Sequence, residues 1–291
     1  MGRRAVKTRR DGASARPLVL KFGGELLENP ANLSAVVAGV AAIAAREPIV
    51  ITHGGGREID AALKRSGIEK RQVDGLRITD DRTLDVVVAV LAGTVNTRLV
   101  AALNAAQVRA VGLTGADASC GLSEAAAPHR AVDGRVVDLE RVGVPSADAD
   151  MGLLHTLTRD GFVPVVACIG MGRDGRLFNV NADTLAGHLA ARLGAHRLVI
   201  AGTTAGVLGD DGRTLPVIDS TAIAKLVNGG TATAGMIAKL RACEHALAGG
   251  VDDVVIVDGR DSTSLVSAAE SGEPALATRI TAGLKPCGTG R

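Results

Sequence analysis

Tryptophan and tyrosine are absent from this 291-residue sequence, and phenylalanine occurs only three times. Because 46% of the residues are nevertheless hydrophobic, the core must be built from aliphatic side chains. Such a core is feasible, since β-branched residues suit strands buried on both faces and alanine suits closely packed helices. Together with the length, this composition predicts one large α/β domain or two lobes that share a sheet.

A large excess of one charge is also absent, because 33 basic and 31 acidic residues leave a net charge of +2. This balance gives no indication of a nucleic-acid partner. Basic residues do gather before Pro17, but no apolar run occurs before Leu18, so this segment lacks the pattern of a signal peptide. We expect residues 1–17 to form a disordered basic leader, with a weak anionic contact as the alternative.

Cysteines are few and scattered, and no C-x-x-C pair or Cys/His cluster indicates a zinc site. No segment approaches the roughly 18 consecutive apolar residues that a membrane span needs. These absences predict a cytoplasmic protein with reduced thiols and no membrane partner.

Two nucleotide-binding signatures are missing as well. The sequence has no G-x-x-x-x-G-K-[ST], which excludes a P-loop enzyme. No G-x-G-x-x-G follows either of the first two apolar runs, which makes a dehydrogenase the weakest of the functional alternatives.

What the sequence does contain is a series of short apolar runs that alternate with helix-like stretches. Each run has the length and the β-branched content of a buried strand. The predicted strands are residues 17–22, 48–53, 162–169, 197–202 and 252–258. Strands that alternate with helices predict a mostly parallel sheet covered on both faces, with ligands at the carboxyl ends of the strands. Residues 116–145 are expected to be irregular or to form a small hairpin.

Glycine-rich turns follow the first two predicted strands, as KFGG (21–24) and HGGG (53–56). Glycines let the backbone approach a phosphate and turn its N–H groups toward it. The lysine at the first strand's end adds a positive charge for a transferring phosphoryl group. A plain turn beside a solvent-facing lysine is the alternative for KFGG.

Later segments supply further polar and charged side chains. Arg77 follows a glycine turn and can either fork onto a carboxylate or form a surface salt bridge. Asn179 and Asn181 alternate along the chain, so on an extended segment both would point to one side and could bind an acylated amino acid. Asp183 can either cap the helix that follows or take part in function. Lys239 lies in the first turn of a predicted helix, where the helix dipole disfavours a cation unless an anion is near.

Together these segments resemble the N-acetylglutamate kinase family of the amino-acid-kinase superfamily. KFGG, HGGG, GLRITD (75–80), FNVNAD (178–183) and GMIAK (235–239) have the order and spacing of that family's motifs, and the resemblance runs from about Leu18 to Ile280. It implies a three-layer αβα sandwich around a mostly parallel central sheet. Residues 18–185 would form the acetylglutamate lobe and residues 186–282 the nucleotide lobe, followed by a tail at 283–291.

The resemblance also implies a reaction and roles for single residues. The γ-phosphate of ATP would pass to the side-chain carboxylate of N-acetyl-L-glutamate, a step of arginine biosynthesis, in a homodimer. Lys21 and Lys239 would neutralise the phosphoryl group in flight, and Asp183 would orient both lysines. The implied substrate-binding residues are Gly54, Gly55, Arg77, Asn179 and Asn181. The implied phosphate- and nucleotide-binding residues are Gly23, Gly24, Thr203, Gly206, Gly235 and Met236.

The family's chemistry needs little else from the protein. Mg2+ would be carried by ATP rather than by protein ligands. No general base is needed, because a carboxylate nucleophile is already ionised at neutral pH. Catalysis can therefore consist of positioning and electrostatics.

Two residues depart from the family's pattern: Thr203 stands where an acid is usual, and Ala234 replaces a small polar residue or glycine. Two alternatives therefore remain beside acetylglutamate. One is a sister kinase for carrier-bound aminoadipate or another amino-acid carboxylate, against which the intact GLRITD argues. The other is a pseudo-kinase that only binds acetylglutamate or nucleotide, against which Lys21, Asp183 and Lys239 argue.

Overall fold

An eight-stranded sheet forms the centre of the computed structural model, which describes residues 16–209, 211–228, 234–270 and 276–282. The strand order is β14-β16-β15-β13-β1-β2-β10-β5, and all neighbours are parallel except β15 and β16. The strands are β1 (Leu18–Phe22), β2 (Ile49–His53), β5 (Ala110–Thr114), β10 (Val163–Ala167), β13 (Arg197–Gly202), β14 (Val217–Asp219), β15 (Asp253–Asp258) and β16 (Ala277–Thr281). The predicted α/β class with a mostly parallel sheet is confirmed. The expected leader, apart from its last two residues, and the expected tail lie outside the described residues.

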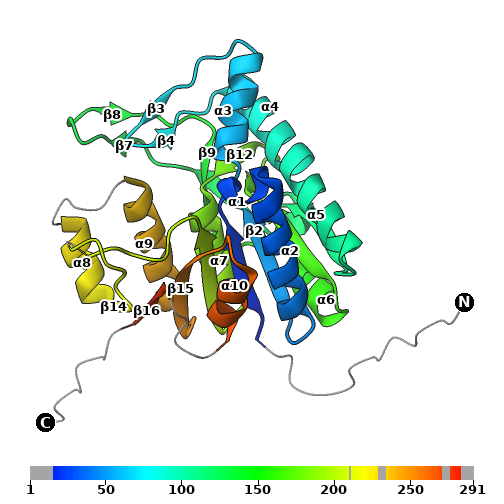
Figure 1. Cartoon of the computed structure of the whole chain (residues 1–291). Coiled ribbons are helices and arrows are strands. Elements are labelled where there is room, and N and C mark those ends of the chain that lie inside the picture. The colour runs from blue at the N-terminus through cyan, green and yellow to red at the C-terminus, as the bar shows by residue number, and fades with distance from the viewer. Residues whose placement is uncertain (1–15, 210, 229–233, 271–275, 283–291) are drawn as a thin grey trace, which may run out of the picture.

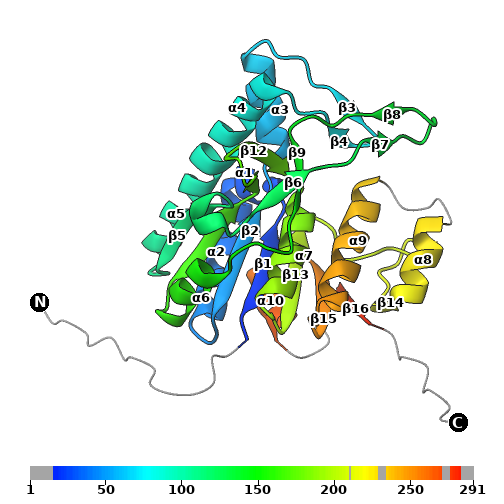
Figure 2. The ribbon, with the colours of Figure 1, turned by 180° about the vertical axis from the view of Figure 1, so that it is seen from behind.

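Helices cover both faces of this sheet, as Figure 1 and the reverse view in Figure 2 show. One layer contains α1 (Gly24–Glu28), α2 (Pro30–Ala44), α5 (Asn96–Ala105) and α10 (Ser262–Ala269), in which α2 packs against α1, α5 and α10. The other layer contains α6 (Gly152–Arg159), α7 (Ala182–Arg192) and α9 (Ala234–Ala248), and α8 (Ser220–Asn228) packs on α9. The sheet and its two helical layers form the expected αβα sandwich.

The five strands predicted from the apolar runs are β1, β2, β10, β13 and β15, and nearly all of their residues are buried. Helix boundaries also follow local signals. The helix after HGGG is α3 (Gly56–Arg65), and it stops just before Gly67, whose φ of 64° is in the left-handed region that glycine adopts freely. Asn29 caps α2, and Pro30 occupies its first position, where the missing N–H costs nothing.

A single long helix follows the β3–β4 segment (residues 72–77) of the chain and precedes β5. It comprises α4 (Asp81–Val88), the π-helical turn η1 (Ala89–Val95) and α5, and it is continuous from Asp81 to Ala105. By length and composition alone, this helix would be long enough and apolar enough to cross a membrane, and no other helix among the described residues passes both criteria. The helix does not appear in the sequence as one long apolar run, because polar residues interrupt the apolar residues after Val95. Leu91, Val95 and Leu99 pack in the main core, as in the core helices that pass the same test.

A second, smaller set of strands lies beyond the carboxyl end of the main sheet. β6 (Ser123–Ala125), β9 (Val142–Pro145), β11 (Ile169–Met171) and β12 (Leu177–Val180) form a four-stranded sheet in the order β11-β12-β9-β6. Two hairpins, β3 (Gln72–Val73) with β4 (Leu76–Arg77) and β7 (His129–Arg130) with β8 (Val136–Val137), share a small hydrophobic cluster around Val73, Ala131 and Leu139. The expectation for residues 116–145 was correct for the β7–β8 hairpin and the short 3-10 turn η2 (Asp117–Ser119), but it missed β6 and β9.

Candidate active site

The two glycine-rich turns meet at the carboxyl end of the central sheet. In the parallel register, Lys21 on β1 lies beside Thr52 on β2. The turns that follow are in direct contact, since an ideal Cβ on Gly24 would lie only 2.7 Å from Cα of Gly55. No side chain fits in that space, so this close approach of two backbones requires glycine.

Three charged side chains converge beside these turns. Nζ of Lys21 lies 2.9 Å from Oδ1 of Asp183, and Nζ of Lys239 lies 3.5 Å from the same oxygen. The three side chains are only 8%, 14% and 16% exposed in the order Lys21, Asp183, Lys239. Two ammonium groups and one carboxylate therefore share a nearly dry region, and among these three groups the positive charges outnumber the negative one.

The pKa values of these groups follow from burial and from their mutual attraction. Burial opposes ionisation of Asp183, but the two lysines outweigh it and lower the pKa of that carboxyl. Burial also favours the neutral amine of Lys21, yet the Asp183 carboxylate holds the pKa of Lys21 above its usual value. For Lys239, burial and repulsion from Lys21 dominate, so its pKa is lowered. Lys239 is thus the cation that gains most when a further anion arrives.

The start of α7 places Asp183 in this position. The side chain of Asn181 caps the helix, since Oδ1 accepts hydrogen bonds from the backbone N–H groups of Asp183 and Thr184 at 2.9 and 3.0 Å. Asp183 is therefore not the cap, which leaves its carboxylate for the two lysines. The same geometry commits the side-chain oxygen of Asn181, a predicted substrate-binding residue, to the helix.

Helix α9 brings Lys239 to Asp183 by packing closely against α7. An ideal Cβ on Gly187 would lie 2.6 Å from the carbonyl oxygen of Ala242, and an ideal Cβ on Gly249 would overlap the side chain of Ala191. The two helices thus touch backbone to backbone at the first level, and at the second Gly249, just beyond α9, lies against the side chain of Ala191. Between these levels the rings of His188 and His245 stack with centroids 6.2 Å apart.

The predicted substrate-binding side chains approach from the smaller sheet and the hairpins. Nδ2 of Asn179, on β12, donates to Oγ1 of the buried Thr79 at 3.1 Å, so FNVNAD and GLRITD are in contact. Arg77, on β4, is 14% exposed and donates from Nη2 to Oδ1 of Asp60 at 2.5 Å. Gly54 donates its N–H to the carbonyl of Phe22 at 3.0 Å, which ties the second glycine turn to the end of β1.

The predicted nucleotide-binding residues lie on two separate elements. Thr203 follows β13 and is half-buried. Gly206, with φ of 111°, is packed against Thr278, whose hydroxyl accepts a hydrogen bond from the N–H of Val207. Gly235 and Met236 are the second and third residues of α9, which begins directly after residues 229–233, a segment that the structure does not describe.

Sequence reasoning missed two side chains at the glycine turns. The carboxylate of Glu25, in the first turn of α1, folds back over Gly23, where an ideal Cβ would overlap it, and its charge favours the protonated form of Lys21 and Lys239. Glu25 directly follows KFGG, but nothing in the pattern reveals that its side chain turns back.

The second interaction that the sequence did not reveal joins His53, the first residue of HGGG, to Asn96. His53 is fully buried, and burial lowers its pKa to about 4, so the ring is neutral at physiological pH. Nε2 of His53 lies 3.2 Å from Nδ2 of Asn96, which also donates to the carbonyl of Val165 at 2.9 Å. Nδ1 lies 3.2 Å from the carbonyl of Gly54, so the protonated Nδ1 tautomer satisfies both ring nitrogens. Asn96 is the first residue of α5, and no sequence pattern linked its side chain to His53.

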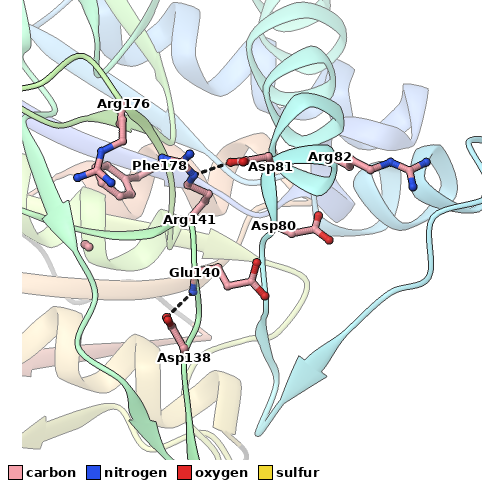
Figure 3. A pocket seen from close by; sticks show the side chains of 9 residues that line it. Asp80, Asp81, Arg82, Asp138, Glu140, Arg141, Arg176 and Phe178 are labelled. Carbon is pink, nitrogen blue, oxygen red and sulfur yellow. Dashed lines mark hydrogen bonds and ion pairs between the residues drawn. The ribbon is translucent and has the colours of Figure 1, made fainter.

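A cavity of about 410 Å³ lies next to this site but is distinct from it. Figure 3 shows the side chains that line it, among them Asp81 and Arg141, which form an ion pair at 2.6 Å. The charged side chains of its lining are Asp80, Asp81, Arg82, Asp138, Glu140, Arg141 and Arg176. This mixture of both signs gives no net attraction for an anion, and the lining includes none of the side chains that converge on Asp183.

Comparison with known proteins adds the family context. The model of the amino acid kinase family matches residues 16–258. The chain is 38% identical to acetylglutamate kinase of Novosphingobium aromaticivorans over 258 residues, which cover 85% of this chain and 84% of the relative. It is 41% identical to acetylglutamate kinase of Rhizorhabdus wittichii over 248 residues, covering 83% and 82%.

Solved structures share the fold at lower identity. N-acetylglutamate synthase of Neisseria gonorrhoeae, solved with coenzyme A and N-acetyl-glutamate, superposes with a TM-score of 0.78 at 24% identity. The match covers 93% of this chain and 60% of the synthase. An isopentenyl phosphate kinase superposes with a TM-score of 0.62 at 22% identity, covering 91% of this chain and 100% of that kinase.

Proposed function

The chain belongs to the amino acid kinase family, and we propose that it transfers the γ-phosphate of ATP to the side-chain carboxylate of N-acetyl-L-glutamate. The product is N-acetylglutamyl 5-phosphate, an intermediate of arginine biosynthesis, and the enzyme would work in the cytoplasm. Residues 18–185 would bind the acylated amino acid, and residues 186–282 would bind the nucleotide.

The observation that carries this proposal is the convergence of Lys21 and Lys239 on Asp183 at the glycine turns. A transferring phosphoryl group spreads negative charge over its oxygens, and two preorganised ammonium groups in a nearly dry site stabilise that charge. Asp183 keeps both lysines in place before the substrates arrive. The nucleophile needs no base, since the substrate carboxylate is ionised at neutral pH.

The two glycine turns and the neighbouring polar side chains would position the reactants. The N–H group of Gly24 would face the phosphates, and that of Gly55 would face the acceptor carboxylate. Gly23 and Gly54, whose N–H groups donate to the carbonyls of Ala201 and Phe22, would instead let the ligands approach the backbone closely. Arg77 would pair with the α-carboxylate of the substrate, and Asn179 and Asn181 would hold its acetamido end. Thr203, Gly206, Gly235 and Met236 would lie along the nucleotide.

Magnesium would reach the site together with ATP. Phosphate oxygens would hold most of the cation's coordination positions. Among the described residues no group of three or more His, Cys, Asp or Glu side chains is arranged to hold a metal ion. Glu25, folded over Gly23, is the side chain that would add an oxygen ligand. When bound, the ion would neutralise part of the negative charge on the phosphates.

We also propose that two copies associate through the β5 edge and the adjacent helix. β5 is the last strand of the main sheet, so its outer side has no partner strand among the described residues. Beside it, the helix from Asp81 to Ala105 leaves small and apolar residues accessible, among them Ala89, Ala92 and Val100. A shallow groove of about 250 Å³ runs between helix and strand. An apolar helix next to an open sheet edge suits a second copy of the same chain.

Hydroxylamine trapping tests the proposed reaction directly, because it converts an acyl phosphate into a stable hydroxamate. The purified chain is incubated with ATP, Mg2+ and one acceptor at a time: N-acetylglutamate, glutamate, N-acetylaspartate or N-acetyl-aminoadipate. We expect hydroxamate with N-acetylglutamate in clear preference to the others. Preference for the aminoadipate derivative would favour the sister kinase. Binding of N-acetylglutamate and ATP without any hydroxamate would favour the pseudo-kinase.

A further inference from the structure

Asp60, on α3, holds the guanidinium of Arg77 from one side. Oδ1 of Asp60 accepts a hydrogen bond from Nη2 of Arg77 at 2.5 Å. Nη1 of the same guanidinium is buried and has no hydrogen-bond partner in the described part of the chain. A buried donor without a partner is costly, and its unmet hydrogen-bonding capacity indicates that a ligand satisfies it.

We propose that Asp60 is a positioning residue for substrate binding: it fixes Arg77 through Nη2 and thereby aims Nη1 at the α-carboxylate of the bound acylated amino acid. This inference rests on the proposed function and adds a residue to it. A planar guanidinium held through one nitrogen has its other donors fixed in direction, so the fork is oriented before the substrate arrives.

The carboxylate of Asp60, so close to an anion-binding arginine, should repel the α-carboxylate of the substrate. The ammonium group of Lys70 offsets this negative charge. Nζ of Lys70 lies 2.9 Å from Oδ2 of Asp60, the oxygen that does not contact Arg77. Burial tends to raise the pKa of Asp60, but the hydrogen bonds from Lys70 and Arg77 outweigh it and hold that pKa below the usual value. Asp60 is therefore ionised at neutral pH, and Lys70 offsets its charge while its hydrogen bond to Arg77 is kept.

The location of Asp60 gives this contact a further consequence. Asp60 lies on the helix that follows the HGGG turn, whereas Arg77 lies on the β3–β4 hairpin. The other attachments of that hairpin are to β7–β8 and to Glu140, which accepts from Arg71 at 2.7 Å. The Asp60–Arg77 pair thus ties the arginine to the glycine turn that would face the same substrate.

The test compares Asp60→Ala and Asp60→Asn with Glu140→Ala, a control that removes the carboxylate paired with Arg71 beside the same hairpin. Binding of N-acetylglutamate is measured by titration calorimetry without ATP, and steady-state constants are measured with ATP and Mg2+. We expect Asp60→Ala to raise the dissociation constant and the KM for N-acetylglutamate about tenfold or more. Asp60→Asn should raise both less, because its amide oxygen still accepts from Nη2. The kcat and the KM for ATP should stay within about twofold of the wild type in both variants.

Thermal denaturation of each variant shows whether the fold is kept. Unchanged or tighter binding of N-acetylglutamate by Asp60→Ala would overturn the inference. Equal weakening by Glu140→Ala would overturn it too, because a general loosening of the hairpin would then explain the loss. The wild-type protein separates the two levels of the argument: if it neither binds N-acetylglutamate nor forms hydroxamate, the proposed function fails together with the inference. If it does both and the Asp60 variants match it, only the inference fails.

Discussion

Nζ of Lys21 and Oδ1 of Asp183 lie 2.9 Å apart at the end of the first strand, with both side chains largely shielded from water. A lysine paired in this way is charged and fixed in position before any phosphate arrives. Preorganisation of this kind is what lowers the barrier of phosphoryl transfer, because the charges need not reorganise during the reaction. The contribution of each lysine that contacts Asp183 to catalysis can therefore be measured by removing Lys21 and Lys239 one at a time.

Lys21→Ala and Lys239→Ala should each lower kcat about 10²-fold or more, as expected for the loss of one preorganised electrostatic contact. The KM for N-acetylglutamate should change much less, since the stabilisation acts on the transition state. Steady-state hydroxamate formation measures both constants. Lys64→Ala, on the exposed face of α3, is the control and should behave like the wild type. Near-normal turnover in either of the first two variants would exclude that lysine from catalysis.

Gly24→Ala should disable the site, whereas Gly56→Ala should be tolerated. A methyl group on Gly24 would meet Cα of Gly55 at 2.7 Å, so the two turns would have to separate. A methyl group on Gly56, the first residue of α3, would meet nothing within 4 Å. We expect Gly24→Ala to reduce kcat/KM about tenfold or more, while Gly56→Ala changes stability by less than about 1 kcal/mol. Comparable kinetics for the two variants would show that the contact between the turns is unimportant.

Acid should destabilise the protein through two buried histidines. Burial lowers the pKa of both His53 and His188 to about 4, below the value of about 6.5 in an unfolded chain. The folded state therefore binds fewer protons between these values, so the stabilisation is complete above about pH 6.5 and is lost as the pH falls toward 4. Each histidine should remove about 1.4 kcal/mol of unfolding free energy per pH unit in this window.

The variant His188→Gln isolates one of these two contributions. Urea denaturation between pH 7 and pH 4.5 measures the free energy of unfolding. Its dependence on pH should be shallower for the variant than for the wild type, by a slope that corresponds to about one proton. His188 faces His245 across α7 and α9, and Arg192 lies on its own helix; the proximity of these two side chains lowers the pKa of His188 in the same direction as burial. An identical slope for variant and wild type would mean that His188 is protonated without cost.

A charge on the proposed dimer face should separate the two copies. Thr97 is exposed on the long helix and lines the groove beside β5, so Thr97→Arg would bury a cation in the interface. We expect light scattering to report about 59 kDa, twice the chain mass of 29.5 kDa, for the wild type and the mass of one chain for the variant. Thr221→Arg, exposed on α8, is the control and should leave the mass unchanged. A wild type that runs as a single chain would refute the proposed dimer.

The sequence predicted the central strands because each is a dense apolar run, and β1, β2, β10, β13 and β15 are nearly completely buried. It did not predict the edge strands. β5 contains a glycine and is partly exposed, and β14 has only three residues, so neither has the pattern of a buried strand.

The site was predictable where spacing along one segment determines position, and not where two segments must meet. Lys21 and the glycine turns follow strands directly, so the sheet topology brings them to one edge. The pairing of Asp60 with Arg77 joins residues 17 positions apart on a helix and a hairpin, and only the tertiary structure brings them into contact. Asp183 was ambiguous because aspartate suits a helix start, and the choice between cap and ion pair depends on where Lys21 lies. Asn181 was expected only at the substrate, yet it is the residue that caps the helix.

The contact between Gly187 and Ala242 limits how the site can adjust to its substrates. Flexible side chains between two helices can change rotamer and let the helices approach, whereas two backbones in contact cannot be compressed further. Helices α7 and α9 are already in backbone contact at Gly187 and Ala242, so they can separate there but cannot move closer. Any tightening of Lys239 around a phosphoryl group must therefore come from rotation about its own side-chain bonds. The reach of one lysine, not the movement of a helix, sets how far the site can close on this side.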